Sequence, residues 1–106
     1  MIKFVGVVYR RPDLSREDFL RHWQNNHADV VKKLPGLRKY VQGPAVTRAG
    51  REPSFDGIAE LWFDDVAALK QAWRSEAGQT VREDERRFID LDRSFAFWAE
   101  EHHVRG

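Results

Sequence analysis

The chain has 106 residues, of which 42% are hydrophobic and 33% are charged, a size and balance that suit one domain with one modest core. Its formal net charge of +1 and its lack of a long apolar run give no reason to expect a nucleic-acid partner or a membrane span, and the absence of cysteine excludes disulfides and thiolate metal sites. We therefore expect a single domain over residues 1–106, without a signal peptide, in the cytoplasm.

The first half of the chain predicts a strand, a long helix and a second strand. Residues 2–9 are apolar on both faces, which indicates a strand that is covered on both sides. Ser15 is placed to cap a helix, and apolar residues at helical spacing continue this helix to about Lys33. Pro35 ends the helix, and residues 37–46 form a more polar strand at the edge of the sheet.

The second half predicts a strand, two helices and a final strand. Residues 55–63 are again apolar on both faces. A helix begins at residue 64 or 65 and ends at Gly78, and residues 79–91 form a shorter helix. Residues 94–102 alternate in the manner of a strand.

The resulting order predicts an α+β domain in which a four-stranded antiparallel sheet carries both long helices on one face. Helices can cover only one face of the sheet, yet three strands are apolar on both faces. The simplest cover for the other face is the same face of a second copy. We therefore expect a homodimer that packs sheet to sheet.

Several segments, taken together and in order, carry a family resemblance. They are Ile2–Tyr9, Ser15–Trp23, His27, Leu34–Tyr40, Asp56–Phe63, Phe88–Asp90 and Glu100–His102. With these segments the chain resembles the EthD family, within the dimeric α+β barrel superfamily. The resemblance implies a ferredoxin-like βαββαβ fold, a dimer whose two sheets form a barrel, and a pocket in each subunit between sheet and helices.

The same resemblance implies a range of activities. The superfamily includes enzymes without bound cofactors, such as muconolactone-type isomerases, polyketide cyclases and quinone-forming monooxygenases, and also some haem-handling enzymes. EthD-type proteins are mostly linked to the degradation of organic compounds. The family's usual His-Ala/Gly-Pro is here His27-Ala28-Asp29, so the helix is expected to continue unbroken past the histidine.

His27 and Glu60 are the candidate catalytic residues. His27 lies in the apolar stripe of the first helix, where an imidazole can act as general acid or base near neutral pH or can simply bond a backbone carbonyl or Glu60. Glu60 lies in the middle of a covered strand and would hold or tune that imidazole. Its alternative role is an ion pair with Arg38, Lys39 or Arg93.

Trp23 and Tyr40 are the candidate substrate-binding residues. Trp23 lies one turn before His27 and would form a pocket wall, and the hydroxyl of Tyr40 would stabilise a developing oxyanion. Each can alternatively be an ordinary packing aromatic. His22 is five residues before His27, so at about 100° per residue the two face about 140° apart and cannot share a metal, and we expect no metal site.

Three functions fit this pattern. The first is a cofactor-free enzyme of catabolism or secondary metabolism that acts by proton transfer on a largely apolar organic molecule, as an isomerase, cyclase, dehydratase or lyase would. The second is oxygen chemistry, either as an oxidoreductase of the monooxygenase type or as a haem-handling protein. The third is a non-catalytic accessory protein that binds a hydrophobic ligand.

Overall fold

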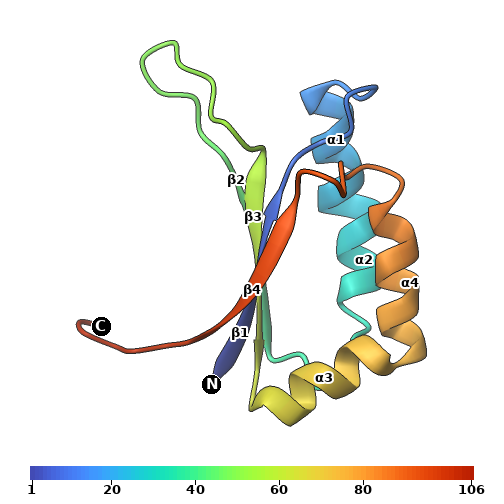
Figure 1. The fold of residues 1–106 in the computed structure, drawn as a ribbon, viewed down its shortest axis with the longest axis vertical. Helices are drawn as coiled ribbons and strands as arrows, with labels where there is room; N and C mark the ends of the chain where they lie inside the picture. Colours follow the sequence, from blue (N-terminus) through green and yellow to red (C-terminus); the bar gives the residue numbers. More distant parts are fainter.

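The structure, a computed structural model, describes residues 1–106 and contains one four-stranded antiparallel sheet with the strand order β2-β3-β1-β4 (Figure 1). This order, joined by helical crossovers, is the α+β ferredoxin-like arrangement expected from the sequence, and that expectation is confirmed. The strands are β1 (Ile2–Val8), β2 (Lys39–Pro44), β3 (Gly57–Phe63) and β4 (Phe95–Glu100).

All helical segments lie on one face of the sheet, to its right in Figure 1, while the opposite side holds only the β2–β3 connection and the C-terminal tail. None of these helices is both long and apolar enough to cross a membrane. The segments are α1 (Arg16–His22), η1 (Trp23–His27), α2 (Ala28–Val31), α3 (Val66–Arg74) and α4 (Glu76–Glu85).

The first three segments form the one continuous helix that the sequence predicts, but with a π-helical turn in its middle. Ser15 caps the helix, since its side chain accepts a hydrogen bond from the amide of Asp18. Within η1 the turn widens, so that the amide of Ala28 donates to the carbonyl of Trp23, five residues earlier. This wider turn changes which side chains share a face of the helix.

The boundary between the last two helices differs from the expected one. The sequence places the end at Gly78, whereas the backbone leaves the helical region at Ser75, whose side chain caps α4 by accepting from the amide of Gly78. Gly78 instead permits close packing of α3 against α4, because a Cβ there would collide with the backbone carbonyl of Trp73. The expected helix end was therefore wrong by three residues.

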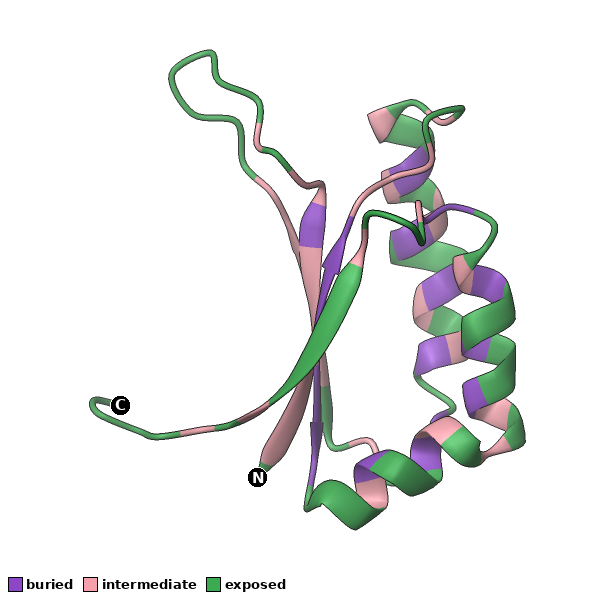
Figure 2. Cartoon of the chain, in the orientation of Figure 1, coloured by how far each residue is buried: buried purple, intermediate pink, exposed green.

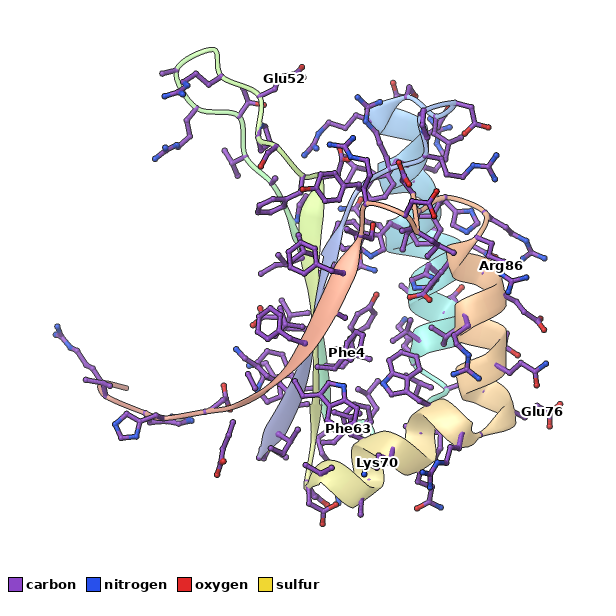
Figure 3. The ribbon with its side chains drawn as sticks, in the orientation of Figure 1. Phe4, Glu52, Phe63, Lys70, Glu76 and Arg86 are labelled. Carbon is purple, nitrogen blue, oxygen red and sulfur yellow. The ribbon has the colours of Figure 1, made fainter.

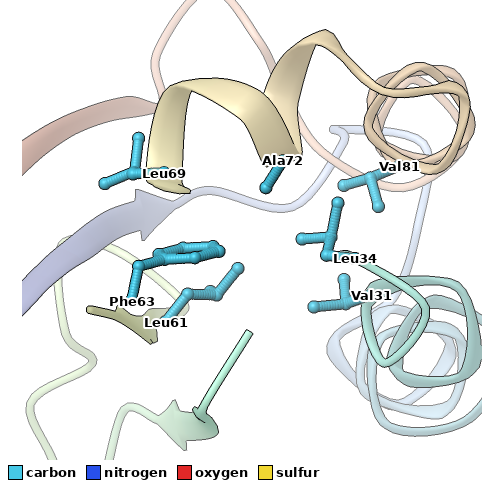
Figure 4. Packing of buried hydrophobic residues seen from close by; sticks show 7 residues of the cluster. All are labelled: Val31, Leu34, Leu61, Phe63, Leu69, Ala72 and Val81. Carbon is cyan, nitrogen blue, oxygen red and sulfur yellow. The ribbon is translucent and has the colours of Figure 1, made fainter. Parts of the chain in front are cut away.

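The core lies between the sheet and the helices in two groups. The larger group joins β3 to α2, α3 and α4, as Figure 4 shows from close by. The second group joins β1 to the first helix and to the segment after α4. Full burial of each large side chain contributes roughly 1.5–3 kcal/mol. The first group is Val31, Leu34, Leu61, Phe63, Leu69, Ala72 and Val81; the second is Val8, Phe19, Trp23, Phe88 and Ile89.

The sheet face without helices, which we call the outer face, carries apolar side chains with little cover. Val41, Glu60, Val5 and Phe97 are paired in this order across the four strands, so they share the outer face. On β4, Phe95 is 57% and Phe97 is 49% exposed, and the whole strand is coloured as mostly exposed in Figure 2. An exposed apolar patch of this kind marks an interaction surface.

Candidate functional site

His27 is buried at the end of the π-helical turn, and only 4% of its surface is exposed. Its Nδ1 lies 2.7 Å from a carboxylate oxygen of Asp84 on α4. The ring also packs against Phe88, with 4.7 Å between ring centroids. The first helix and α4 together therefore fix both the position and the orientation of this imidazole.

Asp84 is the polar centre of this arrangement and is itself only 2% exposed. Besides His27, it contacts Nε2 of His22 at 3.0 Å and accepts a 2.9 Å hydrogen bond from the side-chain amide of Asn26. Arg87 adds a longer contact of 3.3 Å from the solvent side. A buried carboxylate needs such partners, because an unpaired charge in the interior is costly.

The protonation states follow from these contacts. Burial lowers the pKa of His27 below its ordinary value, although the bond to Asp84 opposes the shift, so the imidazole is neutral near pH 7. Burial favours protonation of Asp84, but the hydrogen bonds from His27 and His22 outweigh it and hold its pKa below the ordinary range. An ionised carboxylate only accepts, so Nδ1 of His27 carries the proton and Nε2 keeps its lone pair.

A cavity of about 270 Å³ lies beside His27, between the sheet, the first helix and the end of α4. Nine of its thirteen lining residues are hydrophobic, and Trp23 forms one wall. Nε2 of His27 has no hydrogen-bond partner in the protein, yet it is not among the fully buried unpaired side-chain atoms, so it retains a small accessible surface. The lining residues are Phe4, Gly6, Val7, Val8, Trp23, His27, Ala59, Glu85, Ile89, Leu91, Ser94, Phe95 and Ala96.

Glycine at two positions gives this cavity its shape. A Cβ on Gly57 would lie 2.8 Å from the ring of Trp23, so glycine there lets the indole approach the sheet closely. Gly6 forms part of the cavity floor, where a Cβ would meet only ordinary contacts with Phe4 and Ala59. The missing side chain at Gly6 therefore leaves space in the cavity, and the missing side chain at Gly57 leaves space for Trp23, which forms the cavity wall.

The other two predicted site residues lie outside this cavity. Glu60 is on the outer face, where its carboxylate pairs with Lys3 at 2.8 Å, so it is separated from His27 by the sheet. Tyr40 faces the helices, but its hydroxyl accepts a 2.7 Å hydrogen bond from Gln42 and the residue does not line the cavity. Burial raises the pKa of Tyr40 to about 12. The carboxylate partner of His27 is thus Asp84, in place of Glu60.

His22 and His27 meet at one carboxylate, contrary to the angle expected from an α-helix. In a π-helical turn, residues five apart take the positions that residues four apart take in an α-helix, so the two imidazoles share a face. No group of three or more His, Asp and Glu side chains is arranged to hold a metal ion.

Sequence reasoning missed Asp84 and also Glu85, which lines the cavity. Both lie in a run of alternating charges that reads as a solvated helix face. The signal was their spacing: Val81 and Phe88 are core residues, and positions three and four after Val81 fall on the same face of a helix.

The sequence and the fold both have known relatives. A family model described as the EthD domain matches residues 11–92. An uncharacterized 11.0 kDa protein in the thcB-thcC intergenic region of Rhodococcus erythropolis is 28% identical over 97 residues, which cover 92% of this chain and 93% of the relative. The crystal structure of an ethyl tert-butyl ether d (EthD) family protein from Bacillus halodurans superposes with a TM-score of 0.82 at 27% identity, covering 96% of this chain and 100% of the other.

More distant solved structures share the fold. A dimeric protein of unknown function with a ferredoxin-like fold from Bacteroides fragilis has a TM-score of 0.71 at 11% identity, with 94% of this chain and 95% of the other covered. SnoaB from Streptomyces nogalater, a cofactor-independent oxygenase, has a TM-score of 0.69 at 12% identity, with 97% and 94% covered. Because the EthD model spans most of the sequence and the fold agrees, this chain belongs to the EthD family.

Proposed function

We propose that this protein is an enzyme that binds a small, largely apolar organic molecule and moves a proton on it, with His27 as the base. One observation carries the proposal: Asp84 holds Nδ1 of a neutral His27 at 2.7 Å, while Nε2 stays unpaired beside an apolar cavity. A carboxylate that orients an imidazole in this way fixes its tautomer and stabilises the imidazolium formed when the base accepts a proton.

The cavity supports a substrate with an apolar body. Aromatic and aliphatic side chains form most of its wall, and no lysine or arginine lines it, so nothing there would pair with an anionic group. Chemistry of this kind uses the protein's own side chains and suits the breakdown or biosynthesis of organic compounds in the cytoplasm. Trp23 would pack against the ligand. Glu60 and Tyr40 have no part in this proposal, because they lie away from the cavity.

We further propose that the working form is a homodimer in which two outer faces pack together. Phe95 and Phe97 are about half exposed on that face, and Val41 beside them is also exposed. A second copy is the partner that covers both such faces at once, because a two-fold axis brings like surfaces together. The Bacteroides fragilis protein of the same fold is described as dimeric.

The proton-transfer role can be tested with 5-nitrobenzisoxazole, an uncharged aromatic probe. A base removes the one C–H proton of its isoxazole ring while the N–O bond breaks, which yields a coloured nitrile phenolate. We expect the protein to accelerate this reaction over the same concentration of free imidazole, and His27→Gln to lower the rate at least ~100-fold. The matched control is His102→Gln, since His102 is exposed near the C-terminus and should leave the rate unchanged.

Two results would count against the enzyme reading. A His27→Gln variant that is folded and as fast as the parent protein would remove His27 from the mechanism. A parent protein that binds the probe, seen as a rise in melting temperature, without accelerating the reaction would favour the accessory-protein reading.

A further inference from the structure

We propose that Glu85 is a second proton-transfer group at this site, and that the substrate is an uncharged β-hydroxy carbonyl compound from which His27 and Glu85 together remove water. This inference rests on the proposed role of His27. It adds an acid to the base, and it converts an unspecified proton transfer into an elimination.

The position of Glu85 supports this role. Glu85 is the last residue of α4 and follows Asp84 directly, so the helix that orients His27 also places Glu85. It lines the same cavity as His27 and also a neighbouring hollow of about 210 Å³, formed with Phe4, Trp73, Arg82 and Trp98. Figure 3 shows the labelled Phe4 on the helix side of the sheet, and this residue, like Glu85, lines both spaces.

The carboxyl of Glu85 has no hydrogen-bond or ion-pair partner in the protein, unlike that of Asp84. The groups that act on it are Arg82 and Asp84 from its own helix, with Tyr40 of β2 near enough to interact and His27 lining the same cavity. Burial, reinforced by Asp84 and opposed by Arg82, raises the pKa of Glu85 to about 7. Near neutral pH a substantial share of Glu85 therefore carries a proton while His27 does not, which is the division of roles that an acid and a base require.

A second unpaired group lies at the same end of the site. Nε1 of Trp73 is the one buried side-chain nitrogen or oxygen without a hydrogen-bond partner, and Trp73 lines the hollow together with Glu85. A buried donor that is left without an acceptor destabilises the protein. A small shift of the indole would let an oxygen of a bound molecule accept from it, so this end is suited to an oxygen-bearing group.

The cavity favours elimination over a reaction through a free enolate. Its wall offers no lysine or arginine to stabilise the full negative charge of a free enolate. The hydroxyl of Ser94 accepts a hydrogen bond from the Tyr9 amide and keeps its own proton, which it can donate to the carbonyl oxygen of the substrate. In an elimination, Nε2 of His27 takes the proton from the carbon next to the carbonyl, and its electron pair forms the new C=C bond. The C–O bond of the β-hydroxyl breaks, and Glu85 gives that oxygen its proton, so water leaves. The site then holds an imidazolium and a carboxylate, and transfer of one proton through solvent restores it.

The experiment compares two probes on the same protein. The first is 4-hydroxy-4-phenylbutan-2-one, whose loss of water gives a conjugated enone that is followed by ultraviolet absorbance. The second is 5-nitrobenzisoxazole, whose phenolate leaves readily without an acid. We expect Glu85→Gln to lower the dehydration rate at least ~100-fold and to change the benzisoxazole rate less than about threefold. Glu83→Gln is the matched control, since Glu83 is exposed on the same helix, and it should change neither rate.

The pH profile shows whether Glu85 acts as an acid or only supports the structure of the site. The dehydration rate of the parent protein should fall above about pH 7 as Glu85 loses its proton, and the benzisoxazole rate should not. If Glu85→Gln folds poorly, Glu85→Asp keeps the acid and should keep part of the dehydration rate with the alkaline decline.

The outcomes are distinct. Equal losses with both probes in Glu85→Gln, or no dehydration by a parent protein that processes the benzisoxazole, would overturn the role of Glu85 and leave that of His27 standing. Failure with the benzisoxazole as well would instead overturn the proposed function.

Discussion

Replacing Asp84 by asparagine tests the polar centre of the site, because this change removes the charge and nearly preserves the shape. In the protein the carboxylate accepts from His27, His22 and Asn26 while it is almost fully buried. An asparagine keeps one acceptor oxygen but presents an NH₂ group to at least one of these donors. We therefore expect Asp84→Asn to lose both stability and activity.

The size of the stability loss follows from the contacts. A hydrogen bond to a charged group contributes about 1.5–3 kcal/mol, and the substitution weakens two or more of them while relieving the cost of burying a charge. We expect a net loss of about 3 kcal/mol in the free energy of unfolding. A domain of this size has roughly 5–15 kcal/mol in total, so the variant should still fold, with a melting temperature lowered by roughly 4–8 °C per kcal/mol.

The pH dependence of this loss gives a sharper test. The pKa of Asp84 is lowered in the folded protein, so its contribution to stability is complete above the unfolded pKa of ~3.9 and disappears as the pH falls through the folded pKa. In urea unfolding, the difference in the free energy of unfolding between the parent protein and Asp84→Asn should therefore be largest near pH 7 and should become smaller below about pH 4.

Asp29→Asn is the matched control for this experiment. Asp29 lies on α2, in the same helical layer, but is exposed, with only a 3.7 Å contact to Lys32, so its replacement should change stability by less than about 0.5 kcal/mol. Two results would refute the description of Asp84 as an ionised, fully partnered carboxylate. One is a difference in the free energy of unfolding between the parent protein and Asp84→Asn that is below about 1 kcal/mol, and the other is a difference that is the same at pH 3 and pH 7.

Three further predictions concern Glu85, Gly57 and the outer face. Glu85→Gln should raise stability progressively from about pH 4.5 to pH 7 and by a constant amount above that, because a raised pKa means that the folded protein resists ionisation of Glu85; a shift from 4.5 to about 7 corresponds to about 3 kcal/mol, and chemical unfolding at pH 4 and pH 9 measures it. Gly57→Ala should cost roughly 1–3 kcal/mol and change the tryptophan fluorescence, since its Cβ would lie 2.8 Å from the Trp23 ring and 2.7 Å from the Gly43 carbonyl; an unchanged spectrum would contradict that packing. Phe97→Lys should convert a dimer to a monomer in light scattering, whereas Val104→Lys in the exposed tail should not.

The sequence predicted the fold well because its strongest signals are about burial. A strand that is apolar on both faces, such as residues 2–9, is expected to be buried on both sides of the sheet. In the structure the helices pack on one of these sides. Boundaries were less predictable where a local cap decided the outcome. Ser75 interrupts the second helical region by capping α4, and the spacing of the apolar residues does not predict that break.

The site was predicted only at its centre. His27 is buried where its helical spacing placed it, but the π-helical turn that brings His22 to the same carboxylate does not follow from a regular repeat of 100° per residue. Asp84 and Glu85 were hidden in a charged run, although their spacing from Val81 placed them inward. The face occupied by Glu60 depended on the strand register, which the sequence of one strand does not determine.

The most direct test of this account is nuclear magnetic resonance of the protein with ¹⁵N-labelled histidine, which reports the protonation of each ring nitrogen of His27. We predict a neutral ring at pH 7 with the proton on Nδ1, no proton on Nε2, and a pKa below 6.5. In Asp84→Asn the pKa should fall further, because Asp84 is the group that opposes the effect of burial. An imidazolium at pH 7, or a neutral ring that carries its proton on Nε2, would contradict the assignment of His27 as the base.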